Sequence, residues 1–209
     1  IIITNTNKIY SVGYGISTAS GGVGKWLVLQ MNLDGSGLSV VDQYSTGLYF
    51  SAAESIVMDN SGNLYATGSA ATFTGAAWVV RKSSDGGSTW SVVDSFQPNL
   101  TDSFFPKNIK GDSIGNIYVV GYGYFGVSYS SWVVRKSSDG GITWTNSDVF
   151  DAYASKNARA VNLEIDSSSN VYVVGSALDI YDNTYLVVRK FNGSAWNTSN
   201  QLNLSSSLN

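Results

Sequence analysis

Ile117-Tyr118-Val119-Val120-Gly121 is one of four copies of a short segment, and this repetition decides how the chain folds. The equivalent tyrosines follow one another at intervals of 55, 53 and 54 residues. A second segment, Val-Val-Arg-Lys, recurs with its arginines 54 residues apart, and Leu27-Val28-Leu29-Gln30 stands at its place in the first copy. Because two independent segments recur at nearly the same spacing, the chain is a fourfold tandem repeat. The tyrosines are Tyr10, Tyr65, Tyr118 and Tyr172, and the arginines are Arg81, Arg135 and Arg189.

Each copy has the pattern of β-strands, because it consists of short runs rich in Val, Ile, Tyr and Trp between Gly, Asn, Asp and Ser turns. In the second copy we expect strands A to D at about 54–59, 63–70, 77–83 and 89–96. Four consecutive antiparallel strands in a repeat of about 54 residues predict a β-propeller blade, whose faces are buried by its neighbours. A β-solenoid is the alternative, but its repeats are shorter.

The predicted architecture is therefore an all-β propeller of four-stranded antiparallel blades in one domain, residues 1–209. Four copies could close as a ring, pair with a second chain, or belong to a larger propeller. An open array would expose two apolar blade faces to water, so we expect closure, a second copy or additional blades. The blades are expected at about 1–46, 47–97, 98–151 and 152–204.

The composition excludes several classes of protein. Because the 209 residues include no Cys and no His, thiol catalysis, His-based catalysis, disulfides and zinc sites of the usual ligands are excluded. The 12 Lys and Arg residues form no basic block, and the net charge of −3 argues against a nucleic-acid partner. No apolar run is long enough to span a bilayer, so membrane insertion is not expected. We predict no cofactor and no metal ion.

Two hairpins between strands C and D share the pattern Ser-x-Asp-x-Gly-x-Thr-Trp. The pattern resembles the Asp-box (BNR-like) hairpin of sialidases and many other propellers. In such a turn the carboxylate accepts hydrogen bonds from backbone N–H groups, Gly adopts a positive φ and the Trp packs between blades. We therefore assign a structural role to Ser83, Asp85, Gly87, Trp90, Ser137, Asp139, Gly141 and Trp144.

The turns between strands A and B carry a second signature, Asp-x-x-Gly-Asn-aliphatic-Tyr, which begins at Asp59 and Asp112 and in a weaker form at Asp166. It is similar to the repeat of bacterial secreted propeller proteins of the SBBP type. Together the two resemblances cover almost the whole chain and imply an extracellular or cell-surface bacterial protein. They imply no reaction, because propellers carry many functions. One carboxylate per turn is far short of the roughly six to eight oxygens that bind calcium.

Alternating strands place the A–B and C–D turns on one face and the B–C and D–A loops on the other. The second set of loops varies from copy to copy, as is typical of free loops. Its aromatic rings among neutral polar groups suit a sugar, and they suit a protein partner equally well; inward packing of some rings is the alternative. The predicted ligand-binding residues are Tyr49, Phe50, Phe73, Phe104, Phe105, Tyr124, Phe125, Tyr129, Tyr153 and Tyr181.

A sialidase-like site would need several arginines at the ring centre and a Tyr nucleophile paired with a Glu. This set cannot be placed on the sequence, so no catalytic residue is assigned. The repeated arginines lie near the C–D hairpins, where contacts between blades or protection of a strand edge explain them, and only Arg159 lies in a loop that could reach the site. The carboxylates on the loop face are Glu54, Asp102, Asp151, Asp179 and Asp182.

The sequence thus predicts a non-catalytic extracellular binding or adhesion module that recognises a glycan or a cell-surface ligand through the B–C and D–A loop face. A glycoside hydrolase of the Asp-box, sialidase-like type is the first alternative, because a glycosidase needs only two carboxylates at a suitable separation. A scaffold for protein–protein interaction is the second. The expected partners are a glycan or a surface protein, together with a second copy or further blades that complete the ring.

Overall fold

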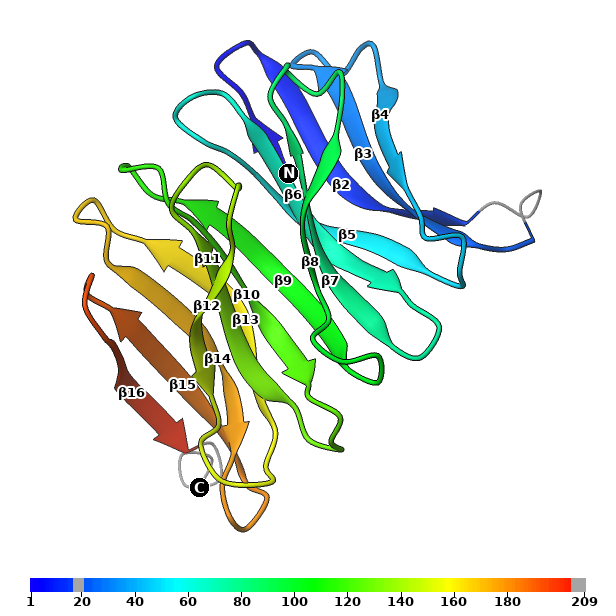
Figure 1. The fold of residues 1–209 in the computed structure, drawn as a ribbon. Coiled ribbons are helices and arrows are strands. Elements are labelled where there is room, and N and C mark those ends of the chain that lie inside the picture. Colours follow the sequence, from blue (N-terminus) through cyan, green and yellow to red (C-terminus); the bar gives the residue numbers. More distant parts are fainter. Residues whose placement is uncertain (17–20, 204–209) are drawn as a thin grey trace.

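The computed structural model describes residues 1–16 and 21–203, and within these ranges the chain forms sixteen β-strands and no helix (Figure 1). Part of the predicted first B–C loop and the predicted end of the fourth blade at residue 204 lie outside the described residues. The prediction of an all-β antiparallel fold is confirmed.

The strands form four units that follow the sequence repeat, and consecutive strands within each unit pair antiparallel. Unit 1 contains β1 (Ile2–Ile3), β2 (Lys8–Ile16), β3 (Gly24–Asn32) and β4 (Ser39–Tyr44). Unit 2 contains β5 (Ser51–Met58), β6 (Leu64–Ala71), β7 (Ala76–Ser83) and β8 (Ser91–Phe96). Unit 3 contains β9 (Ser103–Gly111), β10 (Ile117–Tyr124), β11 (Ser131–Ser137) and β12 (Thr145–Phe150). Unit 4 contains β13 (Ala158–Ile165), β14 (Val171–Leu178), β15 (Thr184–Phe191) and β16 (Trp196–Asn203).

The units follow one another across the molecule, with the first and last sheets at opposite ends (Figure 1). Units 1 and 4 are separate four-stranded sheets, whereas units 2 and 3 share one sheet through a parallel contact between Ala76 of β7 and Ser103 of β9. Within the described residues no sheet closes on itself. The four units therefore form an open array.

The first strands of units 2, 3 and 4 carry a β-bulge at the same place. β9 contacts both β5 and β13, so these three strands are neighbours. Each has one residue without a partner on the next strand, and a bulge of this kind re-aims a side chain, often beside a functional site. The unpaired residues are Glu54, Lys107 and Val161.

The hydrophobic core is divided among the junctions between units, with one cluster in each. A fully buried tryptophan on the third strand of units 1 to 3 contributes to these junctions. Trp26 lies over Gly68 of the next unit, where an added Cβ would come within 2.7 Å of the indole ring, and Trp132 lies over Gly175 in the same way. Glycine is required there because any side chain would collide with the ring and, on its own sheet, with a carbonyl oxygen of the first strand, which would be 2.0 Å from the added Cβ. The three tryptophans are Trp26, Trp78 and Trp132.

A buried ion pair crosses each junction between units. An arginine on the third strand of one unit binds an aspartate on the fourth strand of the preceding unit, with Nε and Oδ2 2.6 Å apart in every case. Each guanidinium also lies over an aromatic ring of the preceding unit. Contacts between units thus explain the repeated arginines. The pairs are Arg81–Asp42, Arg135–Asp94 and Arg189–Asp148.

The two Ser-x-Asp-x-Gly-x-Thr-Trp hairpins share one set of hydrogen bonds. Asp85 accepts from the hydroxyl and the backbone N–H of Thr89, at 2.6 and 2.9 Å, and from the Ser83 hydroxyl at 2.8 Å. These bonds, led by that of the Thr89 hydroxyl, lower the pKa of Asp85 to about 2. Asp139 has the equivalent bonds, and its pKa is also lowered to about 2.

The same hairpins also connect neighbouring units. The Tyr10 hydroxyl donates to the carbonyl of Gly86 at 2.6 Å, and the Tyr65 hydroxyl donates to the carbonyl of Gly140 at 3.0 Å. Within each turn the tryptophan indole N–H donates to a glycine carbonyl, from Trp90 to Gly87 and from Trp144 to Gly141. These side chains are therefore engaged in holding turns and junctions together.

Candidate functional site

Arg159, near the start of β13, holds together a group of side chains on the face formed by the B–C and D–A loops. Its Nη2 donates to the Tyr124 hydroxyl at 2.8 Å, and its Nε donates to Ser130 Oγ at 3.1 Å. The guanidinium carbon lies 4.8 Å from the centroid of the Tyr122 ring. We call Arg159, Tyr122, Tyr124, Ser130 and Phe105 the Arg159 cluster.

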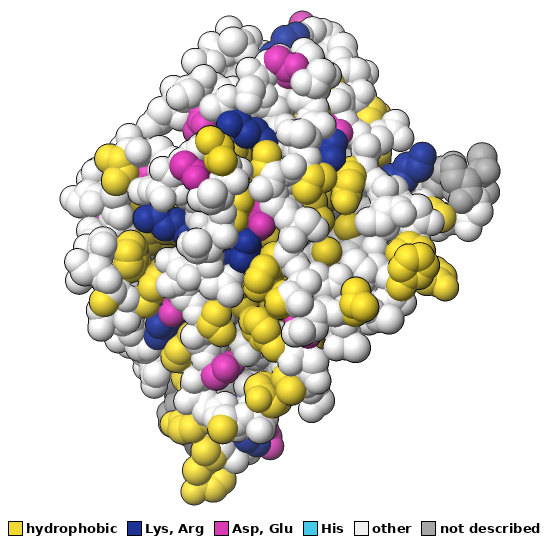
Figure 2. Space-filling model, in the orientation of Figure 1, with side chains coloured by type: hydrophobic (Ala, Val, Ile, Leu, Met, Phe, Trp, Pro, Cys, Tyr) yellow, Lys and Arg dark blue, Asp and Glu magenta, His cyan; other side chains and the backbone are white. Residues whose placement is uncertain are grey.

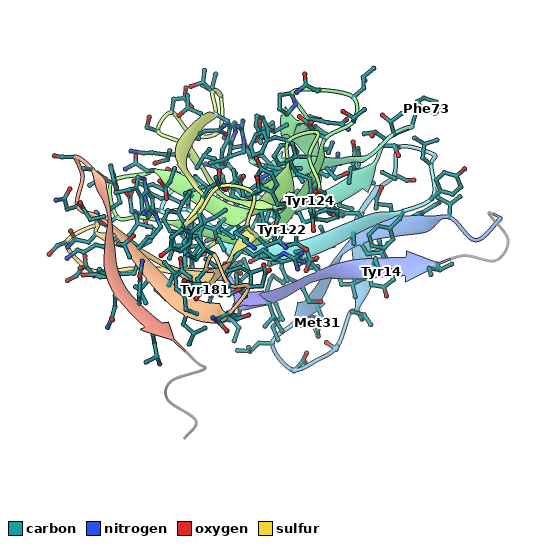
Figure 3. All side chains as sticks on the ribbon, turned by 90° about the horizontal axis from the view of Figure 1, so that it is seen from below. Tyr14, Met31, Phe73, Tyr122, Tyr124 and Tyr181 are labelled. Atoms are coloured by element: carbon teal, nitrogen blue, oxygen red, sulfur yellow. The ribbon has the colours of Figure 1, made fainter. Side chains whose placement is uncertain are left out.

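Three aromatic rings form the apolar side of this cluster. The centroid of the Phe105 ring lies 5.3 Å from that of Tyr122 and 6.4 Å from that of Tyr124. The two tyrosine rings are nearly perpendicular, with centroids 6.2 Å apart. Figure 3 shows Tyr122 and Tyr124 near the middle of the molecule. Half-buried aromatic rings thus lie beside a cation.

The junction between units 3 and 4 fixes the position of Arg159. The backbone N–H and the hydroxyl of Ser130 both donate to Asn157 Oδ1, at 2.8 and 3.0 Å, and the N–H of Ala158 donates to the Ser130 carbonyl at 2.7 Å. Nη1 of Arg159 has no hydrogen-bond partner within residues 1–16 and 21–203. A held guanidinium with a free donor group is suited to bind an anion.

An ion pair joins the bulged strands β9 and β5 at the position of their unpaired residues. Lys107 follows Phe105 of the cluster by two residues on β9, and Glu54 occupies the same position on the neighbouring β5. Lys107 Nζ lies 2.8 Å from Glu54 Oε1, and the two side chains are 31% and 37% exposed. An accessible acid–base pair thus lies on the strand that carries Phe105, two residues further along it.

The structure corrects one of the ten aromatic predictions outright. Phe104 is fully buried between Phe96 and Phe125, with ring centroids 4.7 and 5.0 Å away, so it cannot contact a ligand. The predicted loop ends earlier than expected, because β9 begins at Ser103. Successive strand residues face opposite sides, so Phe104 enters the core and Phe105 joins the Arg159 cluster.

The remaining aromatic predictions are spread over the loop face. Phe50 packs against Tyr14 with ring centroids 5.5 Å apart, and Phe125 packs against Phe104. Tyr129 lines a shallow hollow beside Phe125, and Tyr153 lines a separate pocket. Phe73 lies at the periphery, as Figure 3 shows. The most exposed rings are those of Phe73 at 91%, Tyr49 at 85% and Tyr181 at 78%.

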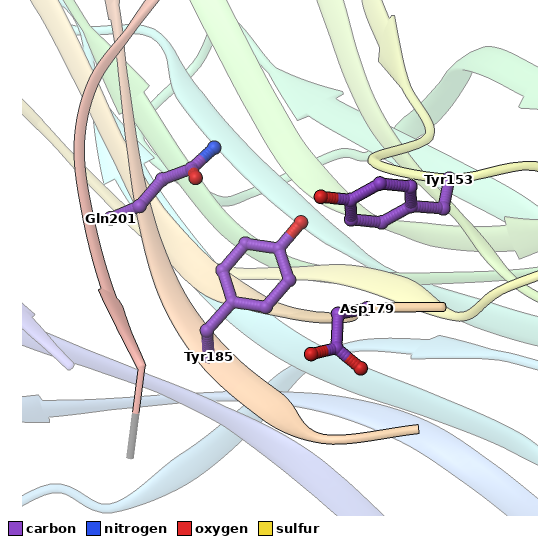
Figure 4. Close-up of a pocket in the computed structure, with 4 residues that line it drawn as sticks. All are labelled: Tyr153, Asp179, Tyr185 and Gln201. Carbon is purple, nitrogen blue, oxygen red and sulfur yellow. The ribbon is translucent and has the colours of Figure 1, made fainter. Parts of the chain in front are cut away.

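The pocket beside Tyr153 lies in unit 4 and is lined by Tyr153, Asp179, Tyr185 and Gln201 (Figure 4). The two tyrosine hydroxyls point toward one another (Figure 4). Hydrogen bonds, led by that from the Asn183 side chain, lower the pKa of Asp179, whereas burial raises the pKa of Tyr185. Because the carboxylate of Asp179 also accepts the backbone N–H groups of its own turn, we assign it a structural role.

The other carboxylates predicted on this face are not gathered in one place. Asp102 is fully buried and accepts hydrogen bonds within its own turn. Asp182 pairs with Lys156 at 2.7 Å, and Asp151 is exposed beside the hollow near Tyr129. Glu54 is the predicted carboxylate that pairs with a residue of β9, the strand that carries Phe105 of the Arg159 cluster.

Sequence reasoning missed Tyr122, Ser130 and Lys107. Tyr122 follows the repeated segment directly and alternates with Tyr124, so both point to one side of β10. The alternation of Tyr122 with Tyr124 could therefore have identified Tyr122 from the sequence. Lys107 was not recognisable, because its exposure depends on a bulge that breaks the two-residue period. Arg159, expected in a loop, belongs to β13.

The described part of the chain shows no group of three or more Asp or Glu side chains placed to hold a metal ion. Within the same residues there is also no helix able to cross a membrane. Figure 2 shows charged side chains of both signs scattered among polar and hydrophobic ones.

No family model and no curated protein matches this chain. Among solved structures it is similar to an ulvan lyase of polysaccharide lyase family PL25, with a TM-score of 0.66 and 14% identity over 96% of this chain and 56% of that one. It is also similar to an α-L-arabinofuranosidase of Fusarium graminearum, with a TM-score of 0.60 and 12% identity over 94% and 64%. A Hadza microbial sialidase matches with a TM-score of 0.55 and 14% identity over 84% and 45%.

These neighbours are propeller folds, in agreement with the propeller-like fold expected from the repeat. At such identities the similarity shows the fold alone, and the chain spans less than two thirds of each of these three structures. The neighbours are mainly enzymes that process glycans. This finding overturns the expectation of a non-catalytic binding module, and the enzymatic alternative agrees with it better.

Proposed function

We propose that this chain is part of a propeller enzyme that cleaves glycan chains, by hydrolysis or elimination, on its B–C and D–A loop face. One observation carries the proposal: a held guanidinium, that of Arg159, lies on this face beside two tyrosines, on β13. The neighbouring strand β9 carries Lys107, which pairs with Glu54 of β5 on its other side. The glycan-processing neighbours support the class of reaction. One of them is described in complex with -[GlcA(1-4)Rha3S]-, an acidic glycan.

The Arg159 cluster favours an acidic glycan as the substrate. A guanidinium binds a carboxylate or a sulfate through parallel N–H groups, and Nη1 of Arg159 is free among the described residues. The rings of Tyr122, Tyr124 and Phe105 offer apolar surface to the C–H groups of a sugar. We assign proton acceptance to Glu54 and proton donation to Lys107, since general acid–base catalysis needs such a pair near the scissile linkage.

The same proposal includes the finer features expected from the repeat. The four units are blades at about 1–46, 47–97, 98–151 and 152–204 of a ring that further blades or a second copy would complete, and the hairpins at Asp85 and Asp139 are Asp-boxes. The exposed rings of Tyr49, Phe73 and Tyr181 would contact sugars further from the centre. The protein would act outside a bacterial cell, where polymeric glycans are found.

A substrate panel tests the proposal. The purified protein is incubated with uronate-containing, sulfated and neutral polysaccharides, and new reducing ends and the ultraviolet absorbance of unsaturated uronate are followed. We expect cleavage of an acidic polysaccharide, lowered about 100-fold or more by Arg159→Ala, which removes the charged donor. The control, Lys110→Ala, removes a cation from the exposed pair with Glu164 and should leave the rate unchanged. No cleavage of any polysaccharide, or equal rates for the Arg159 variant, would contradict the proposal.

A further inference from the structure

Unit 3 has a hollow on the side of its sheet that faces unit 2. The hollow has a volume of about 280 Å³ and is formed by the loop between β10 and β11 together with the start of β11 and the end of β12. Ser131 shares its side of β11 with Val133, which is buried in the junction with unit 2, and this fixes the side on which the hollow lies. We call it the Tyr129 hollow; its lining residues are Phe125, Val127, Tyr129, Ser131, Val149 and Asp151.

Val149 places an apolar side chain in this hollow where the other units carry a polar one. It pairs with Val133 of β11, and the same register in units 1, 2 and 4 holds Gln43, Ser95 and Gln201. Val149 is nevertheless 46% exposed. Packing within the unit therefore does not account for a valine at this position, whereas a ligand with an apolar surface would bury it.

Two further residues of the hollow are held in place by the fold. The Phe125 ring lies perpendicular to that of buried Phe104, with centroids 5.0 Å apart, and so offers a fixed aromatic surface. Ser131 is only 4% exposed, and its hydroxyl has no hydrogen-bond partner within residues 1–16 and 21–203. Buried hydroxyls are normally hydrogen-bonded, so a polar group in the hollow would complete this one. In unit 4 the register of Ser131 holds Tyr185, and the smaller side chain leaves the space open in unit 3.

The polar groups of the hollow select a neutral sugar ring. Asp151 is exposed and forms no ion pair within the described part of the chain, and no Lys or Arg lines the hollow. Its carboxylate can accept hydrogen bonds from sugar hydroxyls, but it repels a uronate or a sulfate. Phe125 and Val149 suit the C–H groups of the ring. The volume lies just below the roughly 300 Å³ at which pockets for larger ligands begin, so the hollow takes a single ring.

The loop between β10 and β11 separates the Tyr129 hollow from the Arg159 cluster. Ser130 accepts a hydrogen bond from Arg159, whereas the next residue, Ser131, lines the hollow. At the other end of the loop Tyr124 binds Arg159 and Phe125 lines the hollow. We propose that the Tyr129 hollow binds a neutral sugar unit of the glycan whose acidic unit binds to the Arg159 cluster. This inference rests on the proposed function, and it makes the substrate a polysaccharide with both acidic and neutral units.

A glycan array separates binding in the hollow from binding at Arg159. The Arg159→Ala protein, which lacks the acidic site, is applied to neutral oligosaccharides and to uronate oligosaccharides of the same length. It should bind neutral oligosaccharides. Adding Val149→Gln should raise the apparent dissociation constant about 10-fold or more, because the apolar contact is lost. Adding Ser131→Tyr, which introduces the side chain that unit 4 carries at this register, should fill the hollow and abolish binding.

Val92→Gln is the matched control, because Val92 is 41% exposed on the fourth strand of unit 2, and it should leave binding unchanged. Circular dichroism and thermal melting establish that each variant is folded. The proposal is overturned by a lack of binding to any neutral oligosaccharide, by binding of uronate oligosaccharides alone, or by an equal loss in the control. Neutral binding that responds to Val149→Gln, in a protein that cleaves no polysaccharide, would support the hollow as a sugar site and contradict only the proposed cleavage.

Discussion

The ion pair between Arg135 and Asp94 should be strongly coupled across the junction of units 2 and 3. Arg135 Nε lies 2.6 Å from Asp94 Oδ2, and both side chains are less than 10% exposed. Burial raises the pKa of Asp94 even though Arg135 acts in the other direction, which shows that isolating this carboxylate from water has a cost. Arg135→Leu removes the compensating charge and should lower the free energy of unfolding by about 3–5 kcal/mol.

The double variant Arg135→Leu with Asp94→Asn removes both charges, whereas Arg135→Leu alone leaves the Asp94 carboxylate buried without its partner. Comparing the two separates the loss of the ion pair from the cost of one unpaired buried charge. Leu29 of unit 1 and Asn200 of unit 4 hold the registers of the arginine and the aspartate in those units. Replacing a buried pair by neutral groups is often close to neutral, so the double variant should be more stable than Arg135→Leu alone by about 2 kcal/mol or more. Urea unfolding, followed by both tryptophan fluorescence and circular dichroism, measures each free energy.

The matched control is the surface pair of Lys110 and Glu164, 2.9 Å apart with side chains 37% and 69% exposed. A double-mutant cycle on this pair should give a coupling below about 1 kcal/mol, because water screens it. A coupling between Arg135 and Asp94 no larger than that of the surface pair would refute the claim that buried ion pairs fasten the units together.

Three further predictions concern the core, the hairpins and the site. Phe104→Ala should lower the free energy of unfolding by about 3–5 kcal/mol, because the ring is fully buried. Phe73→Ala, at a side chain 91% exposed, should change it by less than about 0.5 kcal/mol. Equal losses for the two variants on chemical unfolding would contradict the placement of Phe104 in the core. The pKa values of Asp85 and Asp139 are lowered from 3.8 to about 2, so their stabilisation is present above the ordinary pKa and is lost as the pH falls from about 4 to 2. Thermal melting should show this acid loss in the unmodified protein and less of it after Asp85→Asn with Asp139→Asn. Tyr124→Phe keeps the ring but removes the acceptor of Arg159 Nη2, so glycan cleavage should fall while the melting temperature stays within a few degrees; unchanged cleavage would remove Tyr124 from the site.

The sequence repeat was sufficient to predict the order of strands, because two turn motifs recur in it. One lies between strands A and B and the other between strands C and D. Its weakest point was the first strand of each unit. In unit 2 this strand was expected at 54–59 and is found at Ser51–Met58, since Ser51-Ala52-Ala53 has little β propensity and the bulge at Glu54 interrupts the alternation. The same effect hid Lys107, which lies at the bulge of β9.

The site was predicted only as a face. Loop composition drew attention to Phe105 and Tyr124, which lie in the Arg159 cluster, but it could not tell Phe104 from Phe105, whose side chains face opposite sides of β9. Arg159 was recognised as the arginine able to reach the face. Its partners were not, because the bond to Tyr124 and the support from Ser130 join segments about 30 residues apart across a junction between units. Such contacts depend on how the sheets pack and leave no local sequence pattern.

The most direct test of the proposed function uses a substrate changed at one group. A uronate polysaccharide and the same polysaccharide with its carboxylates reduced to alcohols are offered to the unmodified protein and to Arg159→Ala, and kcat/KM is measured for all four combinations. If the linkage is hydrolysed and Arg159 binds the carboxylate, the unmodified protein should prefer the acidic polymer by about 100-fold or more, and the variant should cleave both polymers at similar, low rates. If the linkage is eliminated, which itself requires the carboxylate, only the acidic polymer is cleaved, and Arg159→Ala should lower that rate about 100-fold or more. An undiminished preference of a hydrolysing variant, or an undiminished rate of an eliminating one, would contradict this role.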